Sequence, residues 1–310
     1  MYYNDDTKRI YGTIFKELRL NKGYSIKEIS DTEVSKATIS KFEHGAAMIS
    51  IDKFFRLLSN INVSPGEFTL YVEERLDIPY SFSSATNNFS AFQDKQKNLV
   101  KVEKTIKRLE DQIQKFPERK FLRIQIINLK AIISQAIPDY KDKIDARDRQ
   151  VIKQHLLVTK NWNDFELRIY CSTIHLFDLP TIELLTHKLL NPFNYRLITP
   201  DIKWMMSVAL VNLTDALLIH GAEDLTESTP YFKQIIRYLE DHPIPNKHIA
   251  EKAFVKFNIG SHYYLINQTE RGLEDMREVI QGLSLLGCDE WANALILEFE
   301  KLTKTSYLEL

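Results

Sequence analysis

Residues 35–41 gather the polar side chains whose types and spacing are best suited to a chemical task. Lys36 and Lys41 can bind phosphate groups or the acceptor atoms of guanine, and Ser40 can bond to base edges that donate or accept. The methyl group of Ala37 can meet the methyl group of thymine, and hydroxyl groups at a helix start can bind phosphate. This chemistry is contact with double-stranded DNA. The candidate residues are Ser35, Lys36, Ala37, Thr38, Ser40 and Lys41.

Two short helical patterns with a tight joint must position these side chains. Ser25 stands three residues before Glu28, a capping box that marks a helix start. A second helix starts at Ser35 and stops at Gly45, and residues 31–34 leave room only for a turn. This arrangement predicts a helix-turn-helix whose second helix lies in the major groove of DNA. The alternative is an ordinary amphipathic helix whose exposed side is polar for solubility.

Length, composition and net charge limit the possible folds and the possible modes of DNA binding. The chain has 310 residues, which favours two domains over one. Its 44% hydrophobic and 27% charged content is that of an ordinary globular protein, and only 9 glycines and 10 prolines favour long helices over a turn-rich β fold. Because the formal net charge is −1, DNA binding must rely on a local basic patch and on the contacts of a dimer.

The sequence does not indicate catalysis or a metal site. It has no Gly-rich phosphate loop, no His-Glu-x-x-His and no nucleophile elbow, so we expect no enzyme and no cofactor. Cys171 and Cys288 lack histidines at zinc-site spacing, and we expect both to be buried free thiols in a reducing compartment. The N-terminus lacks an apolar region and no stretch approaches a membrane-spanning length. These features predict a cytoplasmic protein without membrane contact.

The apolar periodicity predicts helices throughout the chain. Five fill its first part: at 12–22, after Ser25, after Ser35, at 50–60 and at 65–75. Serine, asparagine and aromatic residues without periodicity follow, which indicates a linker. We therefore predict an all-α protein with domains at residues 1–75 and 91–310 and a linker at residues 76–90.

The second part of the chain has a loose repeat of helix pairs. Helix starts near residues 118, 161, 199 and 246 are about forty residues apart, longer than the roughly 34-residue tetratricopeptide unit. Thr229-Pro230 and a start at Thr181 supply further helices between them. Stacked helix pairs present a concave face that suits an extended peptide. The alternative is an irregular helical bundle.

The segment V-S-K-A-T-I-S-K-F-E-H-G at residues 34–45 resembles the helix-turn-helix of Cro/C1-type (Xre-like) repressors. In that family a basic residue of the first helix pairs with the glutamate that follows the apolar pair of the recognition helix. Arg19 and Glu43 stand at the matching positions. The resemblance implies that they form a structural pair, which orients the domain and does not read bases.

Nearly the whole chain resembles the Rgg/GadR/MutR group of regulators from Gram-positive bacteria. Further matching pieces are M-I-S-I-D-K-F at 48–54, E-F at 67–68 and G-L-E-D-M-R-E-V-I-Q-G-L-S-L-L-G at 272–287. The resemblance implies a five-helix Xre-type head followed by a right-handed, tetratricopeptide-like (TPR-like) helical-repeat domain. It also implies a homodimer that binds operator DNA and a short hydrophobic signalling peptide, so that the peptide alters transcription (quorum sensing).

Polar side chains in apolar helices are the candidates for peptide contact. Asn212 and Asn258 lie within apolar segments, as does Asn128, and an amide can both donate and accept bonds to a peptide backbone. For each of them, an amide bonded to a neighbouring helix is an equal alternative. On a helix expected at residues 163–177, the spacing i, i+4, i+7 places Arg168, Ser172 and His175 on one face. The candidate peptide-contact residues are Arg168, Ser172, His175, Asn212 and Asn258.

The chain departs from its relatives at two places. Relatives place Asn and Arg where Ser172 and His175 stand, which implies a different ligand, and His175 can equally be an ordinary surface or core histidine. Some relatives have a cysteine at Ile51, so a disulfide between two heads is not available to this chain. Two other functions remain open. One is a protein-interaction scaffold built on the repeats, and the other is a dimeric repressor that needs no peptide.

Overall fold

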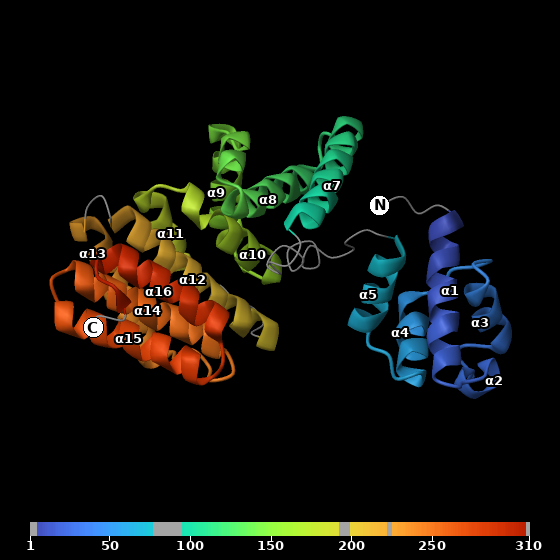
Figure 1. Cartoon of the computed structure of the whole chain (residues 1–310). Helices are drawn as coiled ribbons and strands as arrows, with labels where there is room; N and C mark the ends of the chain where they lie inside the picture. Colours follow the sequence, from blue (N-terminus) through green and yellow to red (C-terminus); the bar gives the residue numbers. More distant parts are fainter. Residues whose placement is uncertain (1–4, 77–94, 192–198, 222–224, 308–310) are drawn as a thin grey trace. The chain divides into compact units, whose positions relative to one another are not determined.

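The computed structural model describes residues 5–76, 95–191, 199–221 and 225–307, and every regular element within these ranges is a helix (Figure 1). The all-α prediction is therefore confirmed. The chain divides into two compact units, at residues 1–105 and 106–310. Residues 77–90 of the predicted linker lie outside the described residues, and the predicted domain limits stay predictions.

The first unit contains the five predicted helices of the head. They are α1 (Asp5–Asn21), α2 (Ile26–Ile29), α3 (Lys36–Glu43), α4 (Ile51–Asn60) and α5 (Pro65–Leu76). The capping box of Ser25 and Glu28 starts α2, and Ser35 is the N-cap of α3. Apolar residues of all five helices form one core around Phe15 and Phe42, whose rings lie 5.6 Å apart. The apolar periodicity thus fixes each helix face, and one core holds the five together.

The second unit is a succession of helices joined by short segments. They are α8 (Lys120–Ala136), α9 (Ala146–Val158), α10 (Asp164–Thr173), α11 (Leu179–Leu190), α12 (Pro200–Gly221), α13 (Leu225–Asp241), α14 (Ile249–Leu265), α15 (Thr269–Leu285) and α16 (Asp289–Thr303). Two 3-10 turns, η2 (Pro138–Lys143) and η3 (Ile174–Leu176), lie between them. Helix α7 (Lys95–Lys115) crosses the division between the units.

The helices of the second unit stack in two layers. Helices α8, α10, α12 and α14, here called the A layer, each contact the next, and α9, α11 and α13 form the B layer behind them. Ser172 Oγ donates to Asn128 Oδ1, and Asn258 Nδ2 donates to Thr214 Oγ1. Both pairs join residues 44 positions apart. This shared offset is the repeat of about forty residues that the helix starts predicted.

Tight packing joins the last repeats. A Cβ atom on Gly272 would lie 2.5 Å from the backbone nitrogen of Tyr264, and a Cβ on Gly260 would lie 3.1 Å from the carbonyl oxygen of Gly272. Only glycine lets the backbones of α14 and α15 approach this closely. Helix α16 then packs on both through a core around Met276 and Phe299.

Two predicted helix starts are wrong. Thr229-Pro230 does not begin a helix, because α13 already starts at Leu225 and Pro230 lies inside it. A proline that early removes one backbone hydrogen bond without ending the helix. Helix α11 starts at Leu179 instead of Thr181, because the Asp178 side chain accepts from the Thr181 backbone N–H and Pro180 occupies the first turn.

Two further expectations need correction. Residues 200–220 are long and apolar enough to span a membrane, contrary to the sequence-based expectation, but half of this stretch is buried within the unit. Helix α12 packs between α10 and α14, as a core helix does. Cys171 is buried, whereas Cys288 is partly exposed because it lies at the N-cap of α16.

Candidate functional site

Helix α3 turns the six DNA-contact candidates away from the core of the head. Ile39, Phe42 and Glu43 are buried, while Ser35, Lys36, Ala37 and Lys41 are exposed and Thr38 and Ser40 are half-buried. Ser35 Oγ accepts from the Thr38 backbone N–H at 3.3 Å and contacts the Thr38 hydroxyl at 3.0 Å. The Ser35 hydroxyl group therefore caps the helix and the Thr38 hydroxyl group bonds to it, while the two lysines supply the charge of the exposed face.

A network around Asp31 fixes the turn between α2 and α3. Its Oδ1 accepts from the backbone N–H groups of Glu33 and Val34, both at 2.8 Å, and its Oδ2 accepts from the Arg56 guanidinium group. The bond from Arg56 is the main cause that lowers the pKa of Asp31. From the sequence we predicted only a short turn here. Asp31 could have indicated how this turn is fixed, because aspartate readily bonds to backbone N–H groups two and three residues further along the chain.

A buried ion pair sets the position of α3 against α1. Arg19 Nε donates to Glu43 Oε1 at 2.6 Å and Arg19 Nη2 donates to Oε2 at 2.8 Å, while Nη1 donates to the Tyr24 carbonyl at 2.6 Å. Both charged side chains are at most 5% exposed. Beside them, a Cβ on Gly12 would clash with the Phe42 carbonyl group. The pair and the close crossing of α1 and α3 together fix the tilt of the exposed face of α3.

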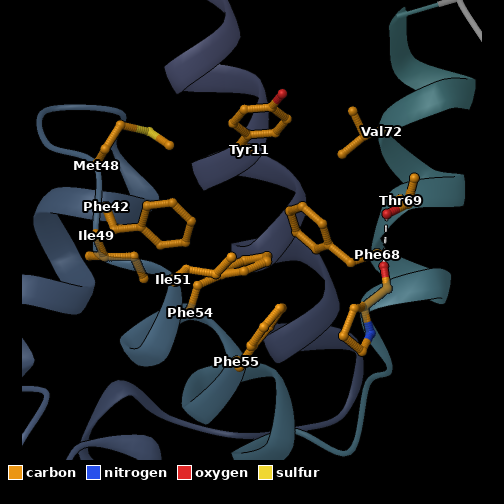
Figure 2. A pocket seen from close by; sticks show the side chains of 11 residues that line it. Tyr11, Phe42, Met48, Ile49, Ile51, Phe54, Phe55, Phe68, Thr69 and Val72 are labelled. Atoms are coloured by element: carbon orange, nitrogen blue, oxygen red, sulfur yellow. Dashed lines mark hydrogen bonds between the residues drawn. The ribbon is translucent and has the colours of Figure 1, made fainter. Parts of the chain in front are cut away.

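The head also contains an apolar pocket of about 390 Å³ between α1, α4 and α5. The aromatic rings of Tyr11, Phe42, Phe54, Phe55 and Phe68 line it (Figure 2). The Thr69 hydroxyl group donates to the Pro65 carbonyl, so it is not directed to a ligand. Ile51, the position of a cysteine in some relatives, lines the pocket and is 69% exposed. This lining offers mainly apolar contact.

The three candidates near α10 have different partners. Arg168 Nε donates to Asp164 Oδ2 at 2.7 Å along its own helix. Ser172 is buried and bonds to Asn128 of α8. His175 lies beyond the end of α10, in η3, with Nε2 at 3.3 Å from Ser134 Oγ of α8. Ser172 and His175 thus both contact α8, while Arg168, one turn before Ser172 on α10, pairs with Asp164.

The candidate amides have partners within the repeat unit. Asn212 Nδ2 donates to the Val208 carbonyl of its own helix at 2.9 Å. Asn258 is only 5% exposed and its Nδ2 donates to Asp215 Oδ1 at 2.6 Å as well as to Thr214. These bonds favour the structural alternative for Asn258, in which the amide bonds to a neighbouring helix. Contact of Asn212 and Asn258 with a ligand stays a prediction.

The sequence analysis did not identify two acidic residues of the A layer, Asp215 and Glu251. Asp215 lies on the exposed side of α12, and Glu251 of α14 accepts from the Trp204 indole N–H at 2.8 Å. The carboxyl group of Asp215 is accessible to solvent but closely surrounded by protein. This loss of hydration raises its pKa to about 6. A carboxylate within an otherwise apolar helix was the available signal.

The described residues contain no cluster of three or more histidine, cysteine or acidic side chains that could hold a metal ion. Burial raises the pKa of the Cys171 thiol to about 12, so this thiol stays protonated and unreactive. The site therefore offers binding surfaces: a basic helix face on the head and a polar-apolar face on the A layer.

Comparisons with known proteins match both units. Residues 106–295 match the family model "HTH-type transcriptional regulator Rgg, C-terminal domain", and residues 15–68 match a helix-turn-helix model. The chain is similar to the crystal structure of the SHP pheromone receptor Rgg2 of Streptococcus dysgalactiae, with 20% identity, a TM-score of 0.65 and coverage of 94% of this chain and 100% of that one. It is also similar to a PrgX/cCF10 complex, with 15% identity, a TM-score of 0.60 and coverage of 96% and 93%. At these identities the two likenesses show the shared fold.

Proposed function

Because the chain belongs to the Rgg family of helix-turn-helix transcriptional regulators, we propose that it binds operator DNA as a homodimer and that a short, mostly apolar signalling peptide controls this binding. The head supplies the DNA contacts, and the repeat unit supplies the peptide site and the dimer contacts. The protein acts in the cytoplasm, where DNA and an imported peptide meet.

The exposed face of α3 carries the DNA-binding proposal. Lys36 and Lys41 extend from a helix whose other side is buried, and the Arg19–Glu43 pair and the Asp31 turn hold that helix rigidly. A rigid, exposed basic helix matches the width of the major groove. Ser35 and Thr38 stand at the start of this helix, where the positive end of the helix dipole favours a phosphate group.

The A layer carries the peptide proposal. Rgg2 is a pheromone receptor by its description, and PrgX has been solved with cCF10. This chain shares their fold and has the candidate side chains Arg168, Ser172, His175, Asn212 and Asn258 on helices α10 to α14. Of these, Asn212 is partly exposed, so its amide oxygen is a candidate acceptor for a peptide backbone bound there.

A peptide can switch the protein only through unequal affinity for two arrangements of the dimer. The peptide that binds one arrangement more tightly raises its population and thereby changes the affinity for DNA. By the same linkage, operator DNA must change the affinity for the peptide by an equal factor.

The test is a titration of the purified full chain with its own upstream DNA and with random DNA of equal length, with and without candidate peptides. The proposal requires preference for the upstream fragment and a shift of that affinity by a peptide. A preference that no peptide shifts would favour the peptide-independent repressor. Equal affinity for both DNAs, with a folded dimer, would favour the interaction scaffold.

A further inference from the structure

The solvent side of α12 presents a continuous stripe of side chains. Trp204, Val208, Val211, Asp215 and Ile219 recur at intervals of three and four residues, so they share one face of the helix. Trp204 is 38% exposed and Ile219 is 66% exposed, while the two valines are half-buried. Exposed large apolar side chains along one face are typical of a binding surface. One acidic group interrupts this stripe.

The neighbouring helix α14 fixes that acidic group. Asn258 is nine-tenths buried, and its Nδ2 donates to Asp215 Oδ1 at 2.6 Å and to Thr214 Oγ1 at 2.9 Å. The amide therefore holds the carboxylate in one orientation without neutralising its charge. Toward the start of α12, Glu251 of α14 fixes the Trp204 ring through the indole N–H. Helix α14 thus orients both a ring and a carboxylate on the face of α12, which runs beside it (Figure 1).

No cation balances the Asp215 carboxylate among the residues that the structure describes. Desolvation raises the pKa of Asp215 most, the hydrogen bond from Asn258 lowers it, and the negative charge of Glu298 in α16 raises it. At neutral pH the group is nevertheless ionised, because that pKa of about 6 lies below 7. A solvent-accessible carboxylate that Asn258 orients, and that has no positive neighbour among the described residues, favours a cationic ligand group.

We infer that Asp215 selects the ligand of this face, and that the ligand is a short apolar peptide with one cationic group, which bonds to the Asp215 carboxylate while its apolar side chains cover Trp204 and Ile219. This inference rests on the proposed peptide-receptor function and adds the chemistry of the peptide. The cation is either the terminal ammonium group or a lysine or arginine side chain, since all three donate charged hydrogen bonds. Asn258 is a positioning residue for the carboxylate.

The test uses synthetic eight-residue peptides of leucine, isoleucine and valine that carry one lysine, glutamine or glutamate at each position in turn. Each is made with a free and with an acetylated N-terminus, and binding to the full-length protein is measured by calorimetry and by Trp fluorescence. The expected result is about tenfold tighter binding of the best cationic peptide than of its glutamine counterpart, the size of one charge-assisted bond. If the cation is instead the terminal ammonium group, acetylation should weaken the binding of lysine and glutamine peptides alike by about tenfold, whereas a lysine preference that persists in the acetylated peptides assigns the cation to the side chain.

Variants locate the effect. Asp215→Asn keeps the size of the side chain and should abolish the tenfold preference, and Asp215→Lys should reverse it in favour of glutamate peptides. Glu240→Gln, which removes one exposed carboxylate from α13 in the B layer, is the matched control and should leave the preference intact. Unchanged thermal unfolding of each variant verifies folding.

Two failures are distinguishable. Apolar peptides that bind with equal affinity whatever their charge, or a preference that survives Asp215→Asn, would overturn the role of Asp215 and leave the peptide-receptor function standing. Absence of binding by every peptide in the set would overturn the peptide-receptor function, and the inference about Asp215 with it.

Discussion

Removing one partner of the buried Arg19–Glu43 pair should destabilise the head selectively. The substitution Glu43→Leu leaves the Arg19 guanidinium group buried without its carboxylate, although its bond to the Tyr24 carbonyl remains. Breaking a buried ion pair in this way costs about 3–5 kcal/mol. A head of this size has a stability of roughly 4–10 kcal/mol. The single substitution should therefore remove a third or more of the stability of the head.

The double substitution Arg19→Met/Glu43→Leu gives the matched comparison. It replaces both charges with apolar side chains of similar size, so no uncompensated charge remains. Such replacements are often neutral or stabilising. We expect the double variant to fold with a stability within about 1–2 kcal/mol of the original, which makes the two positions strongly coupled.

Amide hydrogen exchange of the full-length protein measures this effect by region. The Glu43→Leu variant should lose protection in α1 and α3, and the double variant should regain it. The three tryptophans, Trp162, Trp204 and Trp291, all belong to the second unit, so their fluorescence should show an unchanged transition. If Glu43→Leu changed the protection of α1 and α3 by less than about 0.5 kcal/mol, the pair would not hold α3 in place and the reasoning would be refuted.

Three further predictions concern packing, pH and a buried bond. Gly12→Ala should destabilise the head by about 1–3 kcal/mol, because its Cβ meets backbone, whereas Gly66→Ala, with free space around it, should not; hydrogen exchange compares the two. Burial lowers the pKa of His262 to about 4. Between pH 6.5 and 4, His262 is therefore protonated in the unfolded chain but neutral in the folded chain. Stability of the repeat unit should thus fall between pH 6.5 and 4, and His262→Phe should reduce that fall in Trp-detected thermal unfolding. Ser172→Ala should cost about 1–3 kcal/mol in urea unfolding, because it leaves the Asn128 carbonyl oxygen without its donor, and a wild-type midpoint would argue against this bond.

Local signals in the sequence predicted most helices and the repeat. Capping residues such as Ser25, Ser35 and Asp145 mark helix starts because their side chains bond to backbone N–H groups nearby in sequence. The same logic failed at Thr229 and Pro230, where packing of a longer α13 outweighed the cap-and-proline signal.

Contacts between repeats were beyond the reach of the sequence. Asn258 has an apolar sequence context, and nothing in it shows that Thr214 and Asp215, 44 and 43 residues earlier, accept its two hydrogen bonds. Asp215 could have been identified as a carboxylate in an otherwise apolar helix, but its bond to Asn258 could not. The spacing of Arg168, Ser172 and His175 placed them on one helix face, but α10 ends at Thr173, so the helical spacing does not extend to His175.

The central claim, that the exposed face of α3 holds DNA, is tested most directly by the salt dependence of operator binding. Each phosphate contact adds about 0.9 to the slope of log affinity against log salt concentration. The Lys36→Ala/Lys41→Ala variant of a dimer should therefore bind more weakly, with a slope shallower by about 3–4. Lys120→Ala/Lys160→Ala removes the same charge from exposed positions of the second unit and should match the original protein. If both variants kept the original affinity and slope, α3 would not be the DNA-binding face.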